Sequence, residues 1–361
     1  MEINNRRRAI LEHPQEHEEK VSETFENRFV TANELLGLNI KDVPRLWDPF
    51  ISQVGLSGLV GSSDCGKSTI LRQLAISVAL REKEFLGFPL NVTHGRAIYI
   101  STEDNAYSTS PSIGKQLNFQ KQELLDNLKF LFINSNDYEE MLKEELKKAP
   151  ADLIVIDSFA DLFQGDFNRL SDVRKALSPL VGIANKFNTA VVILHHTVKN
   201  SEFSEPNKNK VNGSQALEAK ARSIIELRSS NINDEKYLSL LKGNYVGKDF
   251  KKQSFILEFD ESTLLFKNSN KKIDKNQLGN SKKYDNPDVD SDLFKYILEE
   301  GRSFNDTYER LVANYGKDQV PKITQLKERV NKEKLRREKI GRTEPKETDR
   351  PTSPEEPKDG G

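Results

Sequence analysis

A glycine-rich loop between an apolar run and a helical stretch limits this chain to a small set of folds. The segment spans residues 56–80 and reads LSGLVGSSDCGKSTILRQLAISVAL. Its centre satisfies the pattern G-x-x-x-x-G-K-[ST], in which backbone N–H groups and the positive end of a helix dipole point at bound phosphates. Because both flanks have the required periodicity, the sequence predicts a strand, a phosphate-binding loop and a helix in that order.

The predicted nucleotide site consists of nine consecutive residues, namely Gly61, Ser62, Ser63, Asp64, Cys65, Gly66, Lys67, Ser68 and Thr69. Lys67 is expected to reach the β and γ phosphates as a point charge, and the Ser68 hydroxyl is expected to hold Mg²⁺. Cys65 occupies an unrestricted position of the pattern, where a small filler is expected. The predicted ligands are therefore ATP and Mg²⁺.

Hydrolysis at such a site also needs a carboxylate for the magnesium shell and a base that orients the attacking water. Asp157 ends the apolar run LIVI and is the candidate for the first role, which makes Ser68 and Asp157 the predicted metal ligands. Ser158 follows it, so the base must come from elsewhere. Glu103 follows the run AIYIS and is the candidate base. Asp104 is its competitor, and a helix N-cap is the structural alternative.

Short apolar runs alternate with helical-period stretches between residues 55 and 266, which is typical of an α/β fold. The expected strands lie near residues 58–60, 97–101, 130–133, 153–156, 190–195, 223–227, 237–241 and 254–259, with helices between the first five. The runs LIVI and VVIL are apolar throughout, as in parallel strands covered on both faces. After residue 222 no helical stretch separates the strands, so antiparallel hairpins are expected to end the sheet.

Composition shifts divide the chain into five parts. The expected parts are a charged N-terminal arm at residues 1–28, the α/β domain at 29–266, a linker at 267–288, a small helical module at 289–342 and a disordered tail at 343–361. The linker and the tail are too polar to bury a core. In the module, apolar residues at helical spacing, a capping-box-like start at Ser303 and Pro321 predict three helices.

The helical module ends in a basic stretch, because residues 317–342 hold ten Lys or Arg and four Asp or Glu. This arrangement resembles a winged-helix or helix-turn-helix unit that touches a DNA backbone. A solvated helix with i,i+4 ion pairs explains the same residues, so both interpretations stay open.

Composition also excludes several classes of protein. One cysteine rules out an internal disulfide framework, and the five histidines lack metal-ligand spacing. The formal net charge of −1 means that any DNA contact must be local. No stretch approaches the roughly 18 apolar residues of a membrane span, and the first residues lack the apolar run of a secretory signal. A cytoplasmic protein without membrane association is expected.

Six motifs in order make the chain resemble the RepA-type hexameric replicative DNA helicases of plasmids and mobile elements. The motifs are GSSDCGKST, YISTEDN, LIVIDSFADLF, VVILHHTVK, GSQALEAKARSIIEL and LLKGNY, and the resemblance runs from about Ala32 to Phe266. It implies a RecA-like P-loop ATPase core with a mostly parallel sheet and terminal antiparallel strands, followed by the small C-terminal helical module. It also implies a homo-oligomeric ring, expected to be a hexamer.

The resemblance implies roles for residues whose function no local pattern indicates. His196 would sense the γ-phosphate, with His195 as the competing candidate. Arg222 would be an arginine finger that enters the ATP site of the neighbouring subunit, and Lys242 would assist from the same edge. The structural alternatives are a pair of satisfied strand-end histidines and a surface cation that starts a strand.

A polar loop between the histidines and Arg222 reads TVKNSEFSEPNKNKVNGSQ and contains Lys199, Lys208 and Lys210, here named the loop lysines. In RecA-like motors the loop after this strand faces the ring channel and grips single-stranded DNA. The resemblance thus implies sequence-independent contacts with phosphates. The loop has fewer glycines than the strongest family members have, and a solvated insertion is the alternative.

The expected function is an ATP-hydrolysing ring motor that translocates on single-stranded DNA and unwinds duplex DNA. It would serve replication or mobilisation of a plasmid-like or integrated element, with replication or mobilisation proteins as partners. One alternative is an ATP-switched recombination or regulatory DNA-binding factor without unwinding activity. The other is a scaffold that only binds nucleotide, against which the intact catalytic positions argue.

Overall fold

The structure is a computed structural model of the 361-residue chain. It describes residues 28–117, 122–133, 138–198, 201, 205–211, 213–230, 235–278, 287–316, 320–321 and 323–341. The predicted charged arm, apart from residue 28, and the predicted tail lie outside these residues. The chain divides into two compact units, Met1–Ser281 and Lys282–Gly361, each with its own apolar core.

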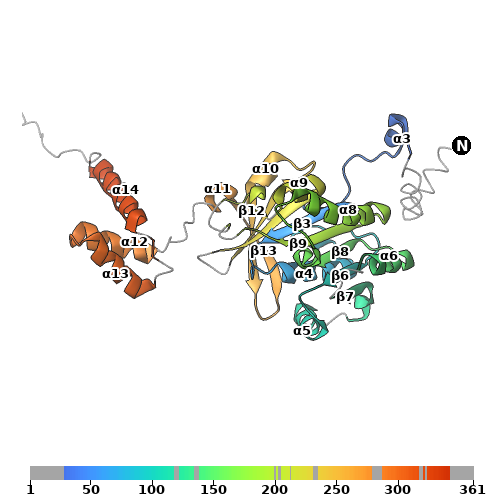
Figure 1. The fold of residues 1–361 in the computed structure, drawn as a ribbon, viewed down its shortest axis with the longest axis horizontal. Helices are drawn as coiled ribbons and strands as arrows, with labels where there is room; N and C mark the ends of the chain where they lie inside the picture. The colour runs from blue at the N-terminus through green and yellow to red at the C-terminus, as the bar shows by residue number, and fades with distance from the viewer. Residues whose placement is uncertain are drawn as a thin grey trace, which may run out of the picture. The chain divides into compact units, whose positions relative to one another are not determined.

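A nine-stranded sheet is the centre of the first unit among the described residues (Figure 1). In spatial order its strands are β13 (Leu265–Asp274), β12 (Gln253–Asp260), β11 (Lys236–Gly243), β10 (Ser223–Ser229), β3 (Gly55–Gly61), β9 (Ala190–His196), β8 (Leu153–Asp157), β6 (Ala97–Ser101) and β7 (Leu128–Phe132). The strands from β10 to β7 are parallel, and those from β10 to β13 are antiparallel. The predicted fold class, a RecA-like α/β core with terminal antiparallel strands, is confirmed.

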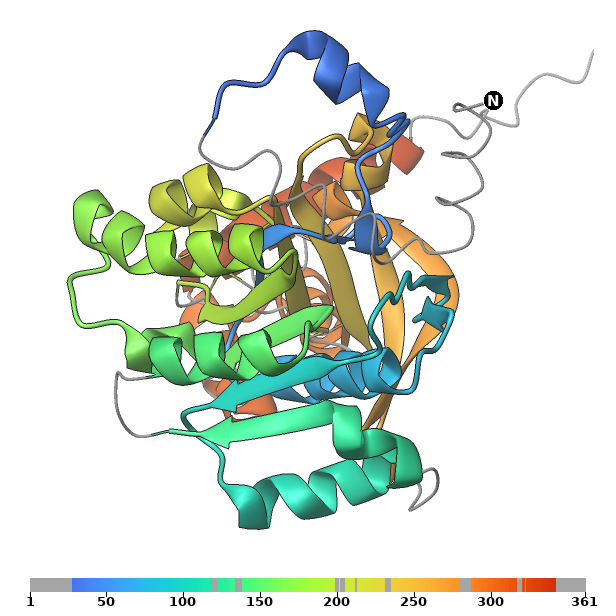
Figure 2. The ribbon, with the colours of Figure 1, turned by 90° about the vertical axis from the view of Figure 1, so that its right-hand side faces the viewer.

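Helices cover both faces of the sheet (Figure 2). The helices on one face are α4 (Lys67–Ala79) and α5 (Ala106–Leu117), and those on the other are α6 (Tyr138–Lys148), α7 (Phe159–Leu162), α8 (Leu170–Lys186) and α9 (Ser214–Lys220). Strands β3 and β8 are buried along their whole length. Coverage on both faces explains why these strands are apolar at nearly every position instead of at alternate ones.

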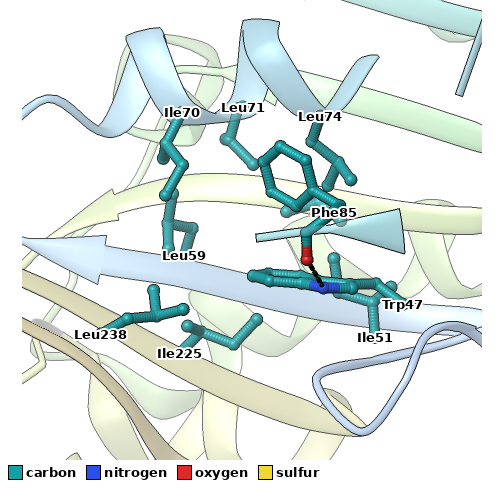
Figure 3. Close-up of a pocket in the computed structure, with 10 residues that line it drawn as sticks. Trp47, Ile51, Leu59, Ile70, Leu71, Leu74, Phe85, Ile225 and Leu238 are labelled. Atoms are coloured by element: carbon teal, nitrogen blue, oxygen red, sulfur yellow. Dashed lines mark hydrogen bonds between the residues drawn. The ribbon is translucent and has the colours of Figure 1, made fainter. Parts of the chain in front are cut away.

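Two small hairpins that the sequence does not predict flank α4. They consist of β1 (Arg45–Trp47) with β2 (Ile51–Ser52) and β4 (Glu84–Phe85) with β5 (Phe88–Pro89). The Trp47 indole N–H donates a hydrogen bond of 3.0 Å to the Phe85 carbonyl and so joins the hairpins. Together with Ile70 and Leu74 of α4, these aromatic residues line a small apolar cavity between the helix and the sheet (Figure 3). Both hairpins therefore contribute to the packing between the phosphate-loop helix and the sheet.

The prediction of a linker at 267–288 is wrong in its first part, because β13 continues to Asp274 and α11 (Lys275–Leu278) follows. The pairing of β13 with β12 extends to Gln253 opposite Asp274. Since β13 is the edge strand of the sheet, its side chains are largely solvated and its polar sequence is compatible with a strand. Residues 279–286 lie outside the described part of the chain.

The remaining elements of the first unit are short. They are the helices α3 (Ala32–Gly37) and α10 (Lys248–Lys252) and the 3₁₀ helices η1 (Gln122–Asn127) and η3 (Lys208–Lys210). No helix in the described ranges combines the length and the apolar character that crossing a bilayer requires.

The second unit is a helical bundle. It contains α12 (Pro287–Phe294), the π-helical turn η4 (Lys295–Glu299), α13 (Phe304–Tyr315) and α14 (Ile323–Gly341). The Ser303 hydroxyl accepts a hydrogen bond of 3.2 Å from the backbone N–H of Asp306, which is the N-cap that the sequence predicts. The described residues of this unit contain no β-hairpin, so they provide no wing for a winged-helix module.

Candidate active site

The predicted phosphate loop connects β3 to α4. Gly66 lies at the N-cap of α4 with φ of 95°, a left-handed conformation that favours glycine, and a Cβ there would lie 2.7 Å from the Phe266 ring. A Cβ on Gly61 would lie 2.2 Å from the Leu227 carbonyl oxygen. No side chain caps α4, so the N–H groups of its first turn face the loop without a side-chain acceptor. This arrangement fits a bound phosphate group.

Lys67 folds back over the loop that precedes it. Its Nζ donates a hydrogen bond of 2.6 Å to the Ser62 carbonyl and lies 3.9 Å from the Cys65 Sγ. Cys65 is fully buried, and burial raises the pKa of its thiol. The thiol thus packs the inside of the loop, while the ammonium group stands where a phosphate can replace the carbonyl as its partner.

Asp157 lies at the end of β8, and its two carboxylate oxygens differ in their surroundings. Oδ2 accepts a hydrogen bond from the buried Tyr99 hydroxyl, at 2.5 Å. Oδ1 is buried and has no partner at ordinary hydrogen-bond geometry among the described residues. Burial raises the pKa of Asp157, and the Tyr99 and Ser68 hydroxyl groups oppose that shift. An open carboxylate oxygen beside a serine hydroxyl fits a hard cation that keeps most of its ligands as water and phosphate.

Glu103 and Asp104 follow β6, and the structure distinguishes them. Asp104 forms an ion pair of 3.0 Å with the buried Arg72 of α4. Glu103 is exposed, and no described residue forms an ion pair with it. Partial burial of the carboxylate raises the pKa of Glu103, and the charges of Asp157 and Asp161 raise it further. A carboxylate with a raised pKa beside Asp157, the candidate metal ligand, is better suited to accept a proton than one held by arginine.

The two histidines at the end of β9 face different surroundings. His196 is paired in register with Gly61 of β3 and therefore lies beside the start of the phosphate loop. Burial lowers the pKa of His196, and the Lys67 ammonium lowers it further. His195 is buried, with its ring 5.1 Å from the Phe167 ring. The geometry thus places His196 beside the phosphate loop and His195 among the aromatic rings of Phe159 and Phe167.

Arg222 lies at the opposite end of the sheet from the phosphate loop. Its backbone N–H donates a hydrogen bond of 2.7 Å to the carbonyl of Leu56, near the start of β3, whereas the loop begins after Gly61 at the end of that strand. The Arg222 side chain is exposed. Lys242 is near the same edge, but its ammonium donates to the Ala221 carbonyl at 2.7 Å, and burial lowers its pKa. Lys242 thus holds the end of α9.

The structure separates the loop lysines. Lys199 lies outside the described residues. Lys208 forms an ion pair with Glu218 of α9, and Lys210 is exposed in η3. Within the described part of the loop, Lys210 is therefore the lysine best placed to meet a phosphate group.

Three further residues that the sequence does not predict contribute to the site. Tyr99 orients Asp157, Arg72 fixes Asp104, and Asp161 accepts hydrogen bonds from two hydroxyl groups near Glu103. The sequence contains a signal for Tyr99, because a tyrosine in an otherwise aliphatic buried strand needs a partner for its hydroxyl. Arg72 and Asp161 carry no such signal, since helix surfaces are commonly charged.

Comparison with known proteins identifies a family and solved structures of similar fold. A family model described as AAA domain matches residues 21–202. A KaiC-like protein from the hyperthermophilic archaeon Pyrococcus horikoshii is 17% identical, with a TM-score of 0.45 over 63% of this chain and 97% of that chain. No curated protein matches the chain.

Proposed function

The chain belongs to the AAA domain family, and from this premise we propose that it is an ATP-hydrolysing ring motor that acts on single-stranded DNA. Its substrates would be ATP and a DNA strand, and the ATP site would be completed by a second copy of the chain. The proposal includes strand separation in replication or mobilisation of a plasmid-like or integrated element.

The position of Arg222 is the main observation that supports assembly of the chain into a ring. The carboxyl ends of β3, β6, β8 and β9 lie at one edge of the sheet and bear Lys67, Glu103, Asp157 and His196. Arg222 lies at the opposite ends of these strands, beside Leu56 of β3. Five residues of β3 separate Leu56 from Gly61, where the phosphate loop begins, and at the rise of a strand this is roughly 17 Å. An arginine so placed cannot reach its own phosphate loop but is free to enter the site of a neighbour.

The site residues suggest how hydrolysis would proceed. Lys67 and the first turn of α4 would hold the phosphates, and Ser68 with Asp157 would hold Mg²⁺, which neutralises charge on the phosphate oxygens. Glu103 would accept the proton of the attacking water. Arg222 of the neighbouring copy would stabilise charge on the transferred group, and His196 would respond to the presence of the γ-phosphate.

The loop lysines support the DNA contact only in part. Because Lys208 is paired with Glu218, its contribution to phosphate binding requires that pair to open. This observation favours a second candidate function, in which the chain is an ATP-switched DNA-binding or regulatory factor that assembles without unwinding.

A pair of assays separates the two functions. A motor shows ATPase activity stimulated by single-stranded DNA together with displacement of a labelled strand from a forked duplex, and Glu103→Gln abolishes both. A switch binds DNA in an ATP-dependent manner and displaces no strand. ATP hydrolysis that DNA does not stimulate, together with no ATP-dependent binding of DNA, would reject both DNA functions and leave only the ATPase.

A further inference from the structure

Asp161 joins the ends of two neighbouring strands. It lies in the first turn of α7, and its Oδ2 accepts a hydrogen bond of 2.7 Å from the Thr102 hydroxyl and one of 2.8 Å from the Ser158 hydroxyl. Thr102 directly follows β6, and Ser158 directly follows β8. One carboxylate oxygen therefore connects the segments that leave the two strands.

The donor and acceptor of each hydrogen bond can be assigned from the number of hydroxyl protons. Thr102 has one proton to donate, and its two nearby acceptors are Asp161 Oδ2 at 2.7 Å and the Asp157 carbonyl at 3.2 Å. The shorter, charge-assisted bond to the carboxylate is the stronger one. The Thr102 oxygen in turn accepts the backbone N–H of Ser158 at 2.9 Å. Asp161, Thr102 and Ser158 thus form a ring of hydrogen bonds, here named the carboxylate latch.

The carboxylate latch lies between the two acidic groups that hydrolysis would use. Thr102 is bonded in the chain to Glu103, and Ser158 is bonded to Asp157. The separation of the proposed base from the proposed metal-binding carboxylate therefore depends on side chains that belong to neither role.

We propose that Asp161 is a positioning residue that, through Thr102 and Ser158, sets the placement of Glu103 relative to Asp157. The inference rests on the proposed ATP hydrolysis. Asp161 itself transfers no proton in this scheme. A base that is free to swing away from its water loses rate without a loss of nucleotide binding, because the phosphate loop is untouched.

Thr102→Val tests the proposal, because it removes the hydroxyl and keeps the branched shape. We expect kcat for ATP to fall roughly 10- to 100-fold, as for a displacement of about 1 Å in a reacting group. Affinity for a fluorescent ATP analogue and the melting temperature should stay unchanged. Thr102→Ser restores a hydroxyl at the same atom and should recover most of the rate, and Asp161→Asn should resemble Thr102→Val.

A double-mutant cycle with Glu103→Gln separates positioning from a general structural role. If the carboxylate latch acts through Glu103, Thr102→Val causes little further loss once the base is absent. An equal loss in both backgrounds, or an unchanged kcat in Thr102→Val, overturns the proposal. If the unaltered protein hydrolyses ATP but Glu103→Gln has no effect, the proposed base is wrong and the latch has no base to place. If the unaltered protein hydrolyses no ATP, the proposed function fails as well.

Discussion

Mixing two inactive variants is the most direct test of a shared ATP site. Lys67→Ala removes the phosphate-binding ammonium but leaves Arg222 intact, and Arg222→Ala removes the finger but leaves the phosphate loop intact. Because Arg222 lies roughly 17 Å along β3 from its own loop, neither variant can repair itself. Arg222→Ala alone should lose about 10³-fold or more in ATPase rate, as expected for an arginine finger supplied in trans. Lys67→Ala alone should lose most ATP binding and therefore most of its ATPase activity.

The mixture should regain activity in a predictable amount. A complete site needs an intact loop from an Arg222→Ala subunit and an intact finger from a Lys67→Ala neighbour. In random equimolar assembly each condition is met half of the time, so about one quarter of the sites are complete, whatever the size of the closed ring. The assay is steady-state phosphate release at increasing ratios of the two variants, with subunit exchange followed by fluorescence transfer.

The exposed Lys248 of α10 provides a matched control. Lys248→Ala alone should hydrolyse ATP at the unaltered rate, and mixing it with Lys67→Ala should lower the rate only by dilution. If the two inactive variants exchange subunits and still show no more ATPase activity together than they show separately, Arg222 is not an arginine finger supplied in trans. The ring motor would then lose its main support.

Further predictions concern the residues of the site. Glu103→Gln should bind ATP normally and turn over about 10²- to 10⁴-fold more slowly, whereas Asp104→Asn should have a much smaller effect, measured by phosphate release; the reverse order would make Asp104 the base. Tyr99→Phe should raise the Mg²⁺ concentration for half-maximal activity by about tenfold, as for loss of a group that orients a metal ligand; an unchanged Mg²⁺ titration would contradict the role of Tyr99. Replacing the loop lysines with glutamine should flatten the salt dependence of single-strand binding, by about 0.7 in log-log slope for each phosphate that the loop no longer binds. An unchanged slope would identify the loop as a solvated insertion.

Local sequence patterns are sufficient for the parallel core. The eight strands expected from apolar runs correspond to β3 and β6 to β12. The central strands β3, β6, β8, β9 and β10 are buried almost throughout, and a strand covered on both faces has to be apolar. The edge strand β13 is not predicted, since a solvated strand has the polar composition of a loop. The hairpins around Trp47 are not predicted either, because strands of two or three residues are too short to show an alternation of apolar and polar residues.

The candidate site shows the same division. The phosphate loop is predictable from the local sequence, because the conformation of Gly66 and the first turn of α4, which no side chain caps, are consequences of adjacent residues. Glu103 and Asp104 are indistinguishable in sequence, and folding brings Arg72 of a different helix against one of them. His195 and His196 are likewise equivalent until strand pairing sets one of them beside Gly61.

A phosphate-binding loop, a covered parallel sheet and acidic groups after two of its strands can all be inferred from the order of residues in this chain. Those features depend on covalent neighbours and on the burial that each residue type tolerates. By contrast, two relations appear only in the folded chain. Arg222 lies at the end of the strands opposite the phosphate loop, and Asp161 links the ends of β6 and β8. Such relations depend on the order of strands in the sheet, which arises from contacts between residues distant in the chain and leaves no mark on any one segment.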